Sequence, residues 1–338
     1  MKSRTAQSHQ QRELSTMSGI LDLAYSYQRS KILLTACELD VFSIFGNESK
    51  TAKEISHEID TDERATERLL NALCAMGLLN KKGGQFSNNR GARWYLVKES
   101  PDYIGNLMHL TDLWDDFGML THAVKEGQEA NYRKRGPESP EVTERAIAYQ
   151  HSILKKQAPE IVQMLNVSKA QRVLDLGCGS GAFAIEFAKA NPKMEIFVFD
   201  SPDIIPYTES YIEKAGMQNH IEILSGDFLK DDSGFGYDIV FLSSYMHRHS
   251  LWDNIYIASK VYRILKPSGQ IAIYDYILND DRTLPEFASL FSLEMLLTSL
   301  AGETYTQTDM WIILKEAWFR EVKKLETPYD ADLILGQR

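Results

Sequence analysis

The chain has few cysteines, no excess of basic charge and no long apolar run. These absences argue, in turn, against a metal site, a nucleic-acid surface and a membrane span. Only three of its 338 residues are cysteines, Cys37, Cys74 and Cys178, and they are scattered without the spacing of a metal site. An odd number of isolated thiols fits a reducing compartment. We therefore predict a cytoplasmic protein with no metal ligands.

The charge balance argues against a nucleic-acid surface. Lysine and arginine number 37 against 47 acids, which gives a formal net charge of −10. A DNA or RNA surface needs a basic field, so we expect no nucleic-acid partner. Residues 1–14 lack the apolar core of a secretory signal. No run approaches the roughly 18 apolar residues of a membrane span, so we expect no membrane partner either.

What the chain does have is enough length for two domains and, in its first hundred residues, the outline of a winged helix. Apolar periodicity predicts a helix over 18–45 and shorter helices over 51–59 and 62–76, with Asp62 as an N-cap. Lys81-Lys-Gly-Gly-Gln85 is typical of a hairpin turn, here the wing. Charges on the second short helix are balanced rather than basic. We interpret this region as a packing or dimerisation domain, with DNA contact as the alternative.

The middle of the chain is apolar and aromatic over 103–124, and residues 131–140 then have the composition of a surface loop. A helix over 141–165 is predicted to lead into the part of the chain where strand and helix patterns alternate. Seven strand-like runs follow, at 172–176, 195–199, 221–224, 238–242, 270–276, 319–325 and 331–335. The first five are apolar almost throughout, which implies burial on both faces, as in a parallel sheet. We therefore predict an α/β fold with a doubly wound, mostly parallel, seven-stranded sheet, preceded by the mainly helical winged-helix domain.

The most informative motif is Val173-Leu-Asp-Leu-Gly-Cys-Gly-Ser-Gly181. It combines a short strand, an acid and three alternating glycines, and a helical pattern follows. Glycines in such a turn let the backbone approach a ligand that faces the helix N-terminus. The motif predicts an adenosine-type cofactor.

Acids after three consecutive strands help to decide which cofactor this is. Asp175, Asp200 and Asp227 each end a strand, and the carboxyl ends of parallel strands meet at one edge of a sheet. Asp200 can accept the ribose hydroxyls, while Asp227 and the ring of Phe228 can receive adenine; the alternative for each acid is a turn or cap. The G-x-G-x-G spacing differs from the G-x-G-x-x-G of dinucleotide sites. An acid such as Asp175 suits an ammonium, so the pattern favours S-adenosylmethionine over NAD.

In these motifs the chain resembles the S-adenosylmethionine-dependent small-molecule O-methyltransferases that carry an N-terminal winged-helix dimerisation domain. Caffeate-type and hydroxyindole O-methyltransferases and bacterial natural-product enzymes belong to this family. The resemblance is carried by residues 30–42, 68–79, 173–181, 199–200, 226–228, 264–269, 291–297 and 304–306. It implies a homodimer formed through the N-terminal domain, a small-molecule acceptor and S-adenosylhomocysteine as the cofactor product.

The resemblance also implies a division of the chain and a set of cofactor residues. A winged-helix dimerisation domain is expected over 1–102, a helical linker that contributes to the acceptor pocket over 103–168, and the Rossmann-like catalytic domain over 169–338. The predicted cofactor-binding residues are Asp175, Gly177, Gly179, Gly181, Asp200, Ser201, Gly226, Asp227, Phe228 and Ser243.

The family's catalytic base is a histidine just past the fourth strand, and His247 matches it. A phenol has a pKa near 10, whereas imidazole has a pKa of about 6.5, so neutral imidazole can assist by removing the phenol proton. Asp275 matches the first of two carboxylates that flank this histidine in plant members. The second falls on Thr304, with Glu303 one residue early, and Arg248-His249 replaces the family's Asp-Trp.

Methionine and aromatic side chains over 103–120, 149–154 and 291–295 predict the acceptor site, and suit a flat aromatic or quinol-like molecule. Three alternatives stay open from the sequence. The replacements around His247 allow the same fold and cofactor site to serve non-methylating chemistry of a hydroxylase, decarboxylase or pericyclase kind. A nicotinamide-dependent reductase and a winged-helix DNA-binding regulator are the other two.

Overall fold

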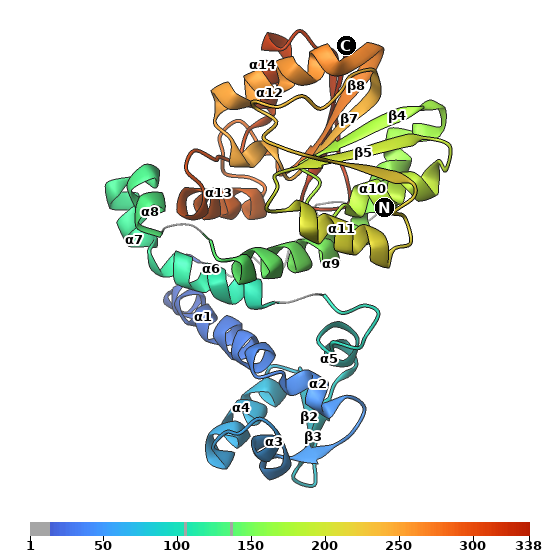
Figure 1. Ribbon diagram of the computed structural model, residues 1–338. Helices are drawn as coiled ribbons and strands as arrows, with labels where there is room; N and C mark the ends of the chain where they lie inside the picture. The colour runs from blue at the N-terminus through green and yellow to red at the C-terminus, as the bar shows by residue number, and fades with distance from the viewer. Residues whose placement is uncertain (1–13, 105–106, 136–137) are drawn as a thin grey trace. The chain divides into compact units, whose positions relative to one another are not determined.

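The computed structural model describes residues 14–104, 107–135 and 138–338, which form two compact units (Figure 1). The first unit ends at Asp112 and the second runs from Leu113 to Arg338. The predicted linker over 103–168 is therefore divided between the two units. The division into three segments stays a prediction.

The N-terminal unit has the helices and the wing in the predicted order. Its elements are α1 (Met17–Glu38), α2 (Val41–Phe45), β1 (Lys50–Thr51), α3 (Ala52–Glu58), α4 (Glu63–Ala75), β2 (Leu79–Lys82), β3 (Gln85–Asn88) and α5 (Arg90–Tyr95). Asp62 caps α4 by accepting a hydrogen bond from the Ala65 N–H at 2.7 Å, as predicted. Gly83 and Gly84 join β2 to β3 at φ of +58° and +81°, a left-handed conformation that glycine adopts without strain. The helix expected over 18–45 is broken into α1 and α2 at Asp40, where φ is +54°.

Helices open the C-terminal unit: α6 (Met108–Gly118, which crosses the unit boundary), α7 (Leu120–Glu126), α8 (Gln128–Arg135) and α9 (Pro140–Leu165). The loop predicted over 131–140 is wrong for its first half, because α8 continues to Arg135. Asn131 is buried there and its side-chain amide donates to the Leu297 carbonyl at 2.9 Å. This tertiary contact outweighs the low helix propensity of a sequence that reads as loop. Residues 136 and 137 lie outside the described residues.

The sheet has seven strands in the order β6-β5-β4-β7-β8-β10-β9, which confirms the predicted fold class. The strands are β4 (Arg172–Leu176), β5 (Glu195–Asp200), β6 (Ile221–Ser225), β7 (Tyr237–Ser243), β8 (Leu265–Asp275), β9 (Arg320–Leu325) and β10 (Asp332–Gln337). The strands from β6 to β8 pair in parallel, and β10 is antiparallel to both β8 and β9. Chain order reverses between β4 and β7, and ligands of such sheets bind at the carboxyl edge beside this switch point.

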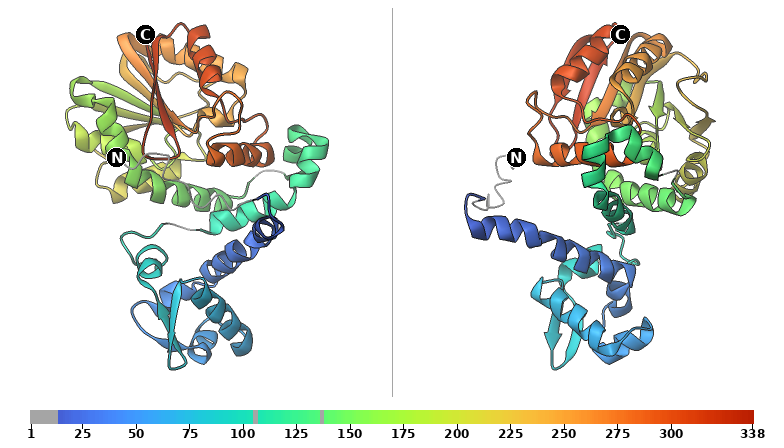
Figure 2. Two further views of the ribbon diagram at one scale, coloured as in Figure 1. Left: turned by 180° about the vertical axis from the view of Figure 1, so that it is seen from behind. Right: turned by 90° about the vertical axis from the view of Figure 1, so that its left-hand side faces the viewer.

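Helices cover both faces of the sheet (Figures 1 and 2). One apolar core joins α9, α10 (Ala182–Ala190) and α11 (Ile205–Lys214) to the sheet, and the other joins α12 (Leu251–Ile264) and α14 (Gln307–Glu316) to its opposite face. Successive residues of β4 alternate between the two cores, Val173 in one and Leu174 in the other, each with no exposed surface. This burial on both faces is why the parallel strands read as continuous apolar runs. None of the described helices is long and apolar enough to cross a membrane.

Candidate functional site

The glycine-rich turn between β4 and α10 is held by its own backbone. Gly177, Gly179 and Gly181 have φ of +71°, +54° and +70°, so all three occupy the left-handed region. The Gly177 N–H donates to the Phe199 carbonyl at 2.8 Å, which ties the turn to the end of β5. A Cβ at position 177 would lie 2.1 Å from the Tyr245 ring, so any side chain there would displace that ring.

Asp175 and Ser243 place buried oxygens without protein partners at this edge. Asp175, near the end of β4, is 1% exposed, and neither of its carboxylate oxygens has a hydrogen-bond partner among the residues described. The pKa of Asp175 is raised to about 7, mainly by burial; the nearby Ala184 N–H, which does not reach hydrogen-bond geometry, lowers it, and the charge of Asp200 raises it. The Ser243 hydroxyl, at the end of β7, is likewise buried and unpartnered. Such orphaned oxygens suit a bound donor, above all a cationic one.

Asp200 lies beside the glycine-rich turn, as predicted. Its two carboxylate oxygens accept hydrogen bonds from the N–H groups of Gly179 and Ser201, each at 2.8 Å. Burial raises the pKa of Asp200, and these hydrogen bonds and the nearby Arg248 guanidinium counteract the rise. The remaining lone pairs of both oxygens can still accept hydroxyl groups.

The segment after β6 adopts the turn that the sequence left as an alternative. Asp227 accepts from the Leu229 N–H at 3.0 Å and pairs with Lys230 at 2.7 Å, and the Lys230 hydrogen bond lowers its pKa. Phe228 is 2% exposed and packs edge-on against Phe199, with 5.8 Å between ring centroids. Its ring belongs to the core, so the packing lends no support to the prediction that it stacks on adenine. A Cβ at Gly226 would lie 2.7 Å from the Asp231 carboxylate, so this position needs glycine.

His247 and Asp275 form a buried pair on the same edge. His247 lies in a short 3-10 helix (η3, Met246–Arg248) just after β7, and Asp275 is the last residue of β8. The His247 Nδ1 is 2.7 Å from Asp275 Oδ1, and the two side chains are 4% and 1% exposed. The carboxylate also accepts from the His247 and Tyr276 N–H groups, at 3.3 and 2.9 Å. A carboxylate can only accept, so Nδ1 carries a proton, and in the neutral ring Nε2 is the nitrogen with the free lone pair.

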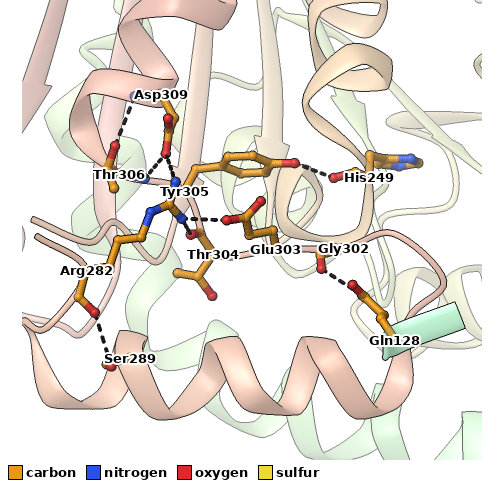
Figure 3. A network of polar contacts seen from close by, with 10 residues as sticks. All are labelled: Gln128, His249, Arg282, Ser289, Gly302, Glu303, Thr304, Tyr305, Thr306 and Asp309. Carbon is orange, nitrogen blue, oxygen red and sulfur yellow. Dashed lines mark hydrogen bonds and ion pairs between the residues drawn. The ribbon is translucent and has the colours of Figure 1, made fainter. Parts of the chain in front are cut away.

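Among the described residues, Asp275 is the one carboxylate that is bonded to the imidazole. The Glu303 carboxylate pairs with Arg282, which also binds Asp309 at 2.8 Å (Figure 3). Thr304, which holds the position of the family's second acid, is fully buried and its hydroxyl has no partner among the described residues. Glu303 supports the base in another way, because its N–H donates to the His247 carbonyl at 2.9 Å.

Residues 302–306, here called the brace, contact the backbone of residues 247–249 through the Glu303 N–H and the Tyr305 hydroxyl. The Tyr305 hydroxyl donates to the His249 carbonyl at 2.6 Å, close to the Glu303 contact (Figure 3). A Cβ at Gly302 would lie 2.4 Å from the His247 carbonyl oxygen, so the two segments pack as closely as backbone allows. Sequence reasoning missed the brace, because only the fold brings these segments together.

Gln128 at the start of α8 anchors both the brace and helix α13 (Glu286–Thr298). Its amide nitrogen lies within 2.9–3.2 Å of four oxygens, the carbonyls of Met295, Ser299 and Gly302 and the Ser299 hydroxyl. The last carbonyls of a helix have no partner within the helix, so Gln128 caps α13 from another element. No motif in the sequence signals this role.

Of the predicted acceptor segments, 291–295 reaches the base. The Phe291 ring meets the His247 ring edge-on at 4.8 Å, and Tyr276 packs against Phe291 at 4.6 Å. Glu294 lies one helical turn after Phe291, on the same face of α13, and its charge raises the pKa of Tyr149 together with burial. Tyr276 was absent from the prediction. Residues 103–112 belong to the other unit, so their part in the acceptor site stays a prediction.

Comparison with known proteins adds two family matches. Residues 117–320 match the O-methyltransferase domain, and residues 21–98 match the O-methyltransferase dimerisation domain.

Three similar proteins illustrate the relationship. The tetracenomycin polyketide synthesis 8-O-methyl transferase TcmO of Streptomyces glaucescens is 24% identical over 326 residues, covering 94% of this chain and 96% of TcmO. A human probable bifunctional dTTP/UTP pyrophosphatase/methyltransferase protein is 28% identical over 336 residues, covering 94% of this chain but only 53% of the human protein. The chain therefore spans about half the length of that relative. The solved structure of PigF with SAH has a TM-score of 0.87 at 22% identity, covering 96% of this chain and all of PigF.

The capping role of Gln128 predicts a loss of stability in Gln128→Glu. The carboxylate cannot donate to the four oxygens and would face them with like partial charge, which we expect to cost about 1–3 kcal/mol. For a unit of this size, each kcal/mol corresponds to a fall in Tm of about 2–4 °C, measurable by calorimetry. Gln163→Glu, on the exposed side of α9, is the matched control and should leave Tm unchanged. An unchanged Tm in Gln128→Glu would remove the capping role.

Proposed function

Since the chain belongs to the O-methyltransferase family, we propose that it methylates a hydroxyl group on a small aromatic or quinol-like molecule, with His247 as the general base. The observation that carries this proposal is the buried pair of His247 and Asp275 on the same sheet edge as the glycine-rich turn. The family match gives no support to the reductase, the DNA-binding regulator or the non-methylating alternatives.

S-adenosylmethionine is the cofactor, and we propose that the orphaned oxygens of Asp175 and Ser243 and the carboxylate of Asp200 hold it. When bound, this cofactor supplies a methyl group activated by its positively charged sulfur. Gly177, Gly179 and Gly181 leave room for close approach of a ligand to the backbone. The adenine role of Asp227 stays a proposal with weaker support, because its carboxylate is exposed and already paired with the Lys230 ammonium.

In this proposal His247 Nε2 takes the proton of the acceptor hydroxyl. Asp275 accepts a hydrogen bond from the Nδ1–H group, which keeps the imidazole in the tautomer that can act as a base, and stabilises the imidazolium after proton transfer. Phe291 and Tyr276 pack against this pair and limit its contact with water. Positioning of the acceptor and exclusion of water then provide the larger share of the acceleration.

His247→Gln tests the base. We expect methyl transfer to a phenolic acceptor to fall by about 10²–10⁴-fold, the usual contribution of a general base, measured with labelled S-adenosylmethionine over a panel of phenols and quinols. Affinity for S-adenosylhomocysteine, measured by titration calorimetry, should stay within a few-fold of the parent chain. His249→Gln, two residues away, is the matched control and should keep its activity. Full activity in His247→Gln would exclude His247 as the base.

The raised pKa of Asp175 predicts that cofactor binding releases a proton near pH 7. Its pKa of about 7 leaves the free carboxyl partly protonated, and an ammonium bound beside it lowers that pKa. Calorimetric titration with S-adenosylhomocysteine in buffers of different ionisation enthalpy measures the release. Asp175→Asn should reduce it, leaving only what Asp200 contributes. Equal proton release by the parent chain and by Asp175→Asn would contradict the assignment of Asp175 to the cofactor site.

The same shift has a consequence for the stability of the free protein. The folded-state pKa of Asp175 is raised above its unfolded value of about 4, so the folded state binds the extra proton between about pH 4 and 7. Stability therefore declines as pH rises through this window. Asp175→Asn should flatten the decline, which thermal unfolding at several pH values measures.

We further propose that the protein is a homodimer joined through its N-terminal unit and works in a reducing compartment such as the cytoplasm. The first half of α1 exposes apolar side chains that no described contact covers, namely Met17, Ile20, Leu21, Leu23, Tyr25 and Tyr27. An exposed apolar face of this extent suits a second copy of the chain, which fits the dimerisation-domain match. All three cysteines are unpaired, as reducing conditions require.

Sedimentation velocity tests the dimer. The full chain should sediment at twice its monomer mass at micromolar concentration, and Ile20→Asp with Leu23→Asp should convert it to monomer because buried carboxylates oppose association. Asp22→Asn, between them, should leave the dimer intact. A monomeric parent chain would contradict the proposal.

A further inference from the structure

His151, in the middle of α9, contacts the glycine-rich turn from outside the sheet. Its Nδ1 lies 2.8 Å from the hydroxyl oxygen of Ser180, the residue between Gly179 and Gly181. Ser180 is 5% exposed, so this hydrogen bond is shielded from water. Ile147, one helical turn earlier on α9, lies 3.8 Å from the position of a Cβ on Gly179. One face of α9 therefore packs directly on the turn.

Helix α11 holds the same turn from a second direction. The Thr208 hydroxyl donates to the Gly179 carbonyl at 2.6 Å, and Thr208 is fully buried. Tyr211, three residues later on the same face of α11, stacks on His151 with 4.0 Å between ring centroids and 23° between ring planes. His151 thus touches the turn through its nitrogen and α11 through its ring face.

The charges around His151 keep its ring neutral. Burial, followed by the charges of the Lys155 and Lys214 ammonium groups, lowers the pKa of His151 to about 4. Lys214 also lies 5.2 Å from the Tyr211 ring centroid. Near neutral pH the hydrogen bond to Ser180 is therefore formed by a neutral imidazole.

We propose that His151 is a positioning residue for the cofactor: its hydrogen bond to Ser180 and its stack on Tyr211 fasten the turn over 177–181 in the conformation that binds the ligand. The turn needs such support because three of its residues are glycines in the left-handed region, which an unrestrained chain leaves readily. Hydrogen bonds with Asp200 and Thr208 hold Gly179. The hydrogen bond with His151 holds Ser180, the next residue. The inference rests on the proposed function only in taking the turn as the cofactor site.

Three variants separate the hydrogen bond from the stack. His151→Phe keeps a ring on Tyr211 but cannot bond to Ser180, Ser180→Ala removes the same bond from the other side, and His151→Asn restores a polar partner without the ring. Loss of a shielded neutral hydrogen bond should weaken S-adenosylhomocysteine binding about 3- to 10-fold, measured by titration calorimetry on the full chain. We expect His151→Phe and Ser180→Ala each to show this loss, and His151→Asn to recover part of it.

The double variant His151→Phe with Ser180→Ala decides the matter. If the two residues act through one bond, the double variant binds no more weakly than the weaker single variant. Losses that multiply, or a His151→Phe that lowers Tm without changing the dissociation constant, would overturn the proposal and leave His151 with a purely structural role. His57→Phe, on the exposed surface of the N-terminal unit, is the matched control and should bind normally.

Hydrogen exchange of the free protein gives a second readout that needs no ligand. Amides over 178–182 should exchange faster in both single variants than in the parent chain, while those of the brace stay unchanged. Unchanged exchange over 178–182 would contradict the proposal. A parent chain that does not bind S-adenosylhomocysteine would instead contradict the proposed function, so the two failures are distinguishable.

Discussion

The desolvation of carboxyl groups at the carboxyl edge of the parallel sheet is the constraint on which the rest of the site depends. Asp175, Asp200 and Asp275 end three strands that are buried on both faces, so each loses most of its hydration. The fold compensates each one differently. Asp275 pairs with His247, Asp200 accepts two backbone N–H groups, and Asp175 receives neither. Asp175, whose oxygens have no hydrogen-bond partner among the described residues, is therefore the acid proposed for a cationic ligand.

The base is positioned by backbone rather than by a second acid. The Glu303 carboxylate pairs with Arg282, which also pairs with Asp309, and the Glu303 N–H still donates to the His247 carbonyl. The Gln128 amide donates to the carbonyl of Gly302, the residue before Glu303. It also binds the end of α13, the helix whose Phe291 packs on the imidazole. A histidine held through its main chain keeps its orientation without a further buried charge, which would need compensation of its own.

Features that depend on local sequence could be predicted, and those that depend on tertiary contact could not. Strand positions, the Asp62 cap and the glycine turn follow from apolar patterning and backbone conformation, which a short window of sequence contains. The α8 helix was missed because its stability comes from Asn131 and Gln128 reaching the end of α13, about 170 residues away. The adenine role of Phe228 stays a prediction, since a ring after a strand reads the same whether it faces a ligand or the core, and in the structure it packs against Phe199.

The buried pair of His247 and Asp275 is enough for the proposed chemistry, because methyl transfer removes the positive charge of the sulfonium. The donor begins positive and ends neutral, so no large negative charge develops that a hole of hydrogen-bond donors would have to stabilise. The reaction requires the acceptor oxygen to be aligned with the methyl group. Backbone segments held in one conformation provide this alignment. The turn over 177–181 and the brace over 302–306 meet that demand in the same way. Each segment is held by side chains from helices distant in sequence, so cofactor and base are positioned by independent contacts on one edge of the sheet.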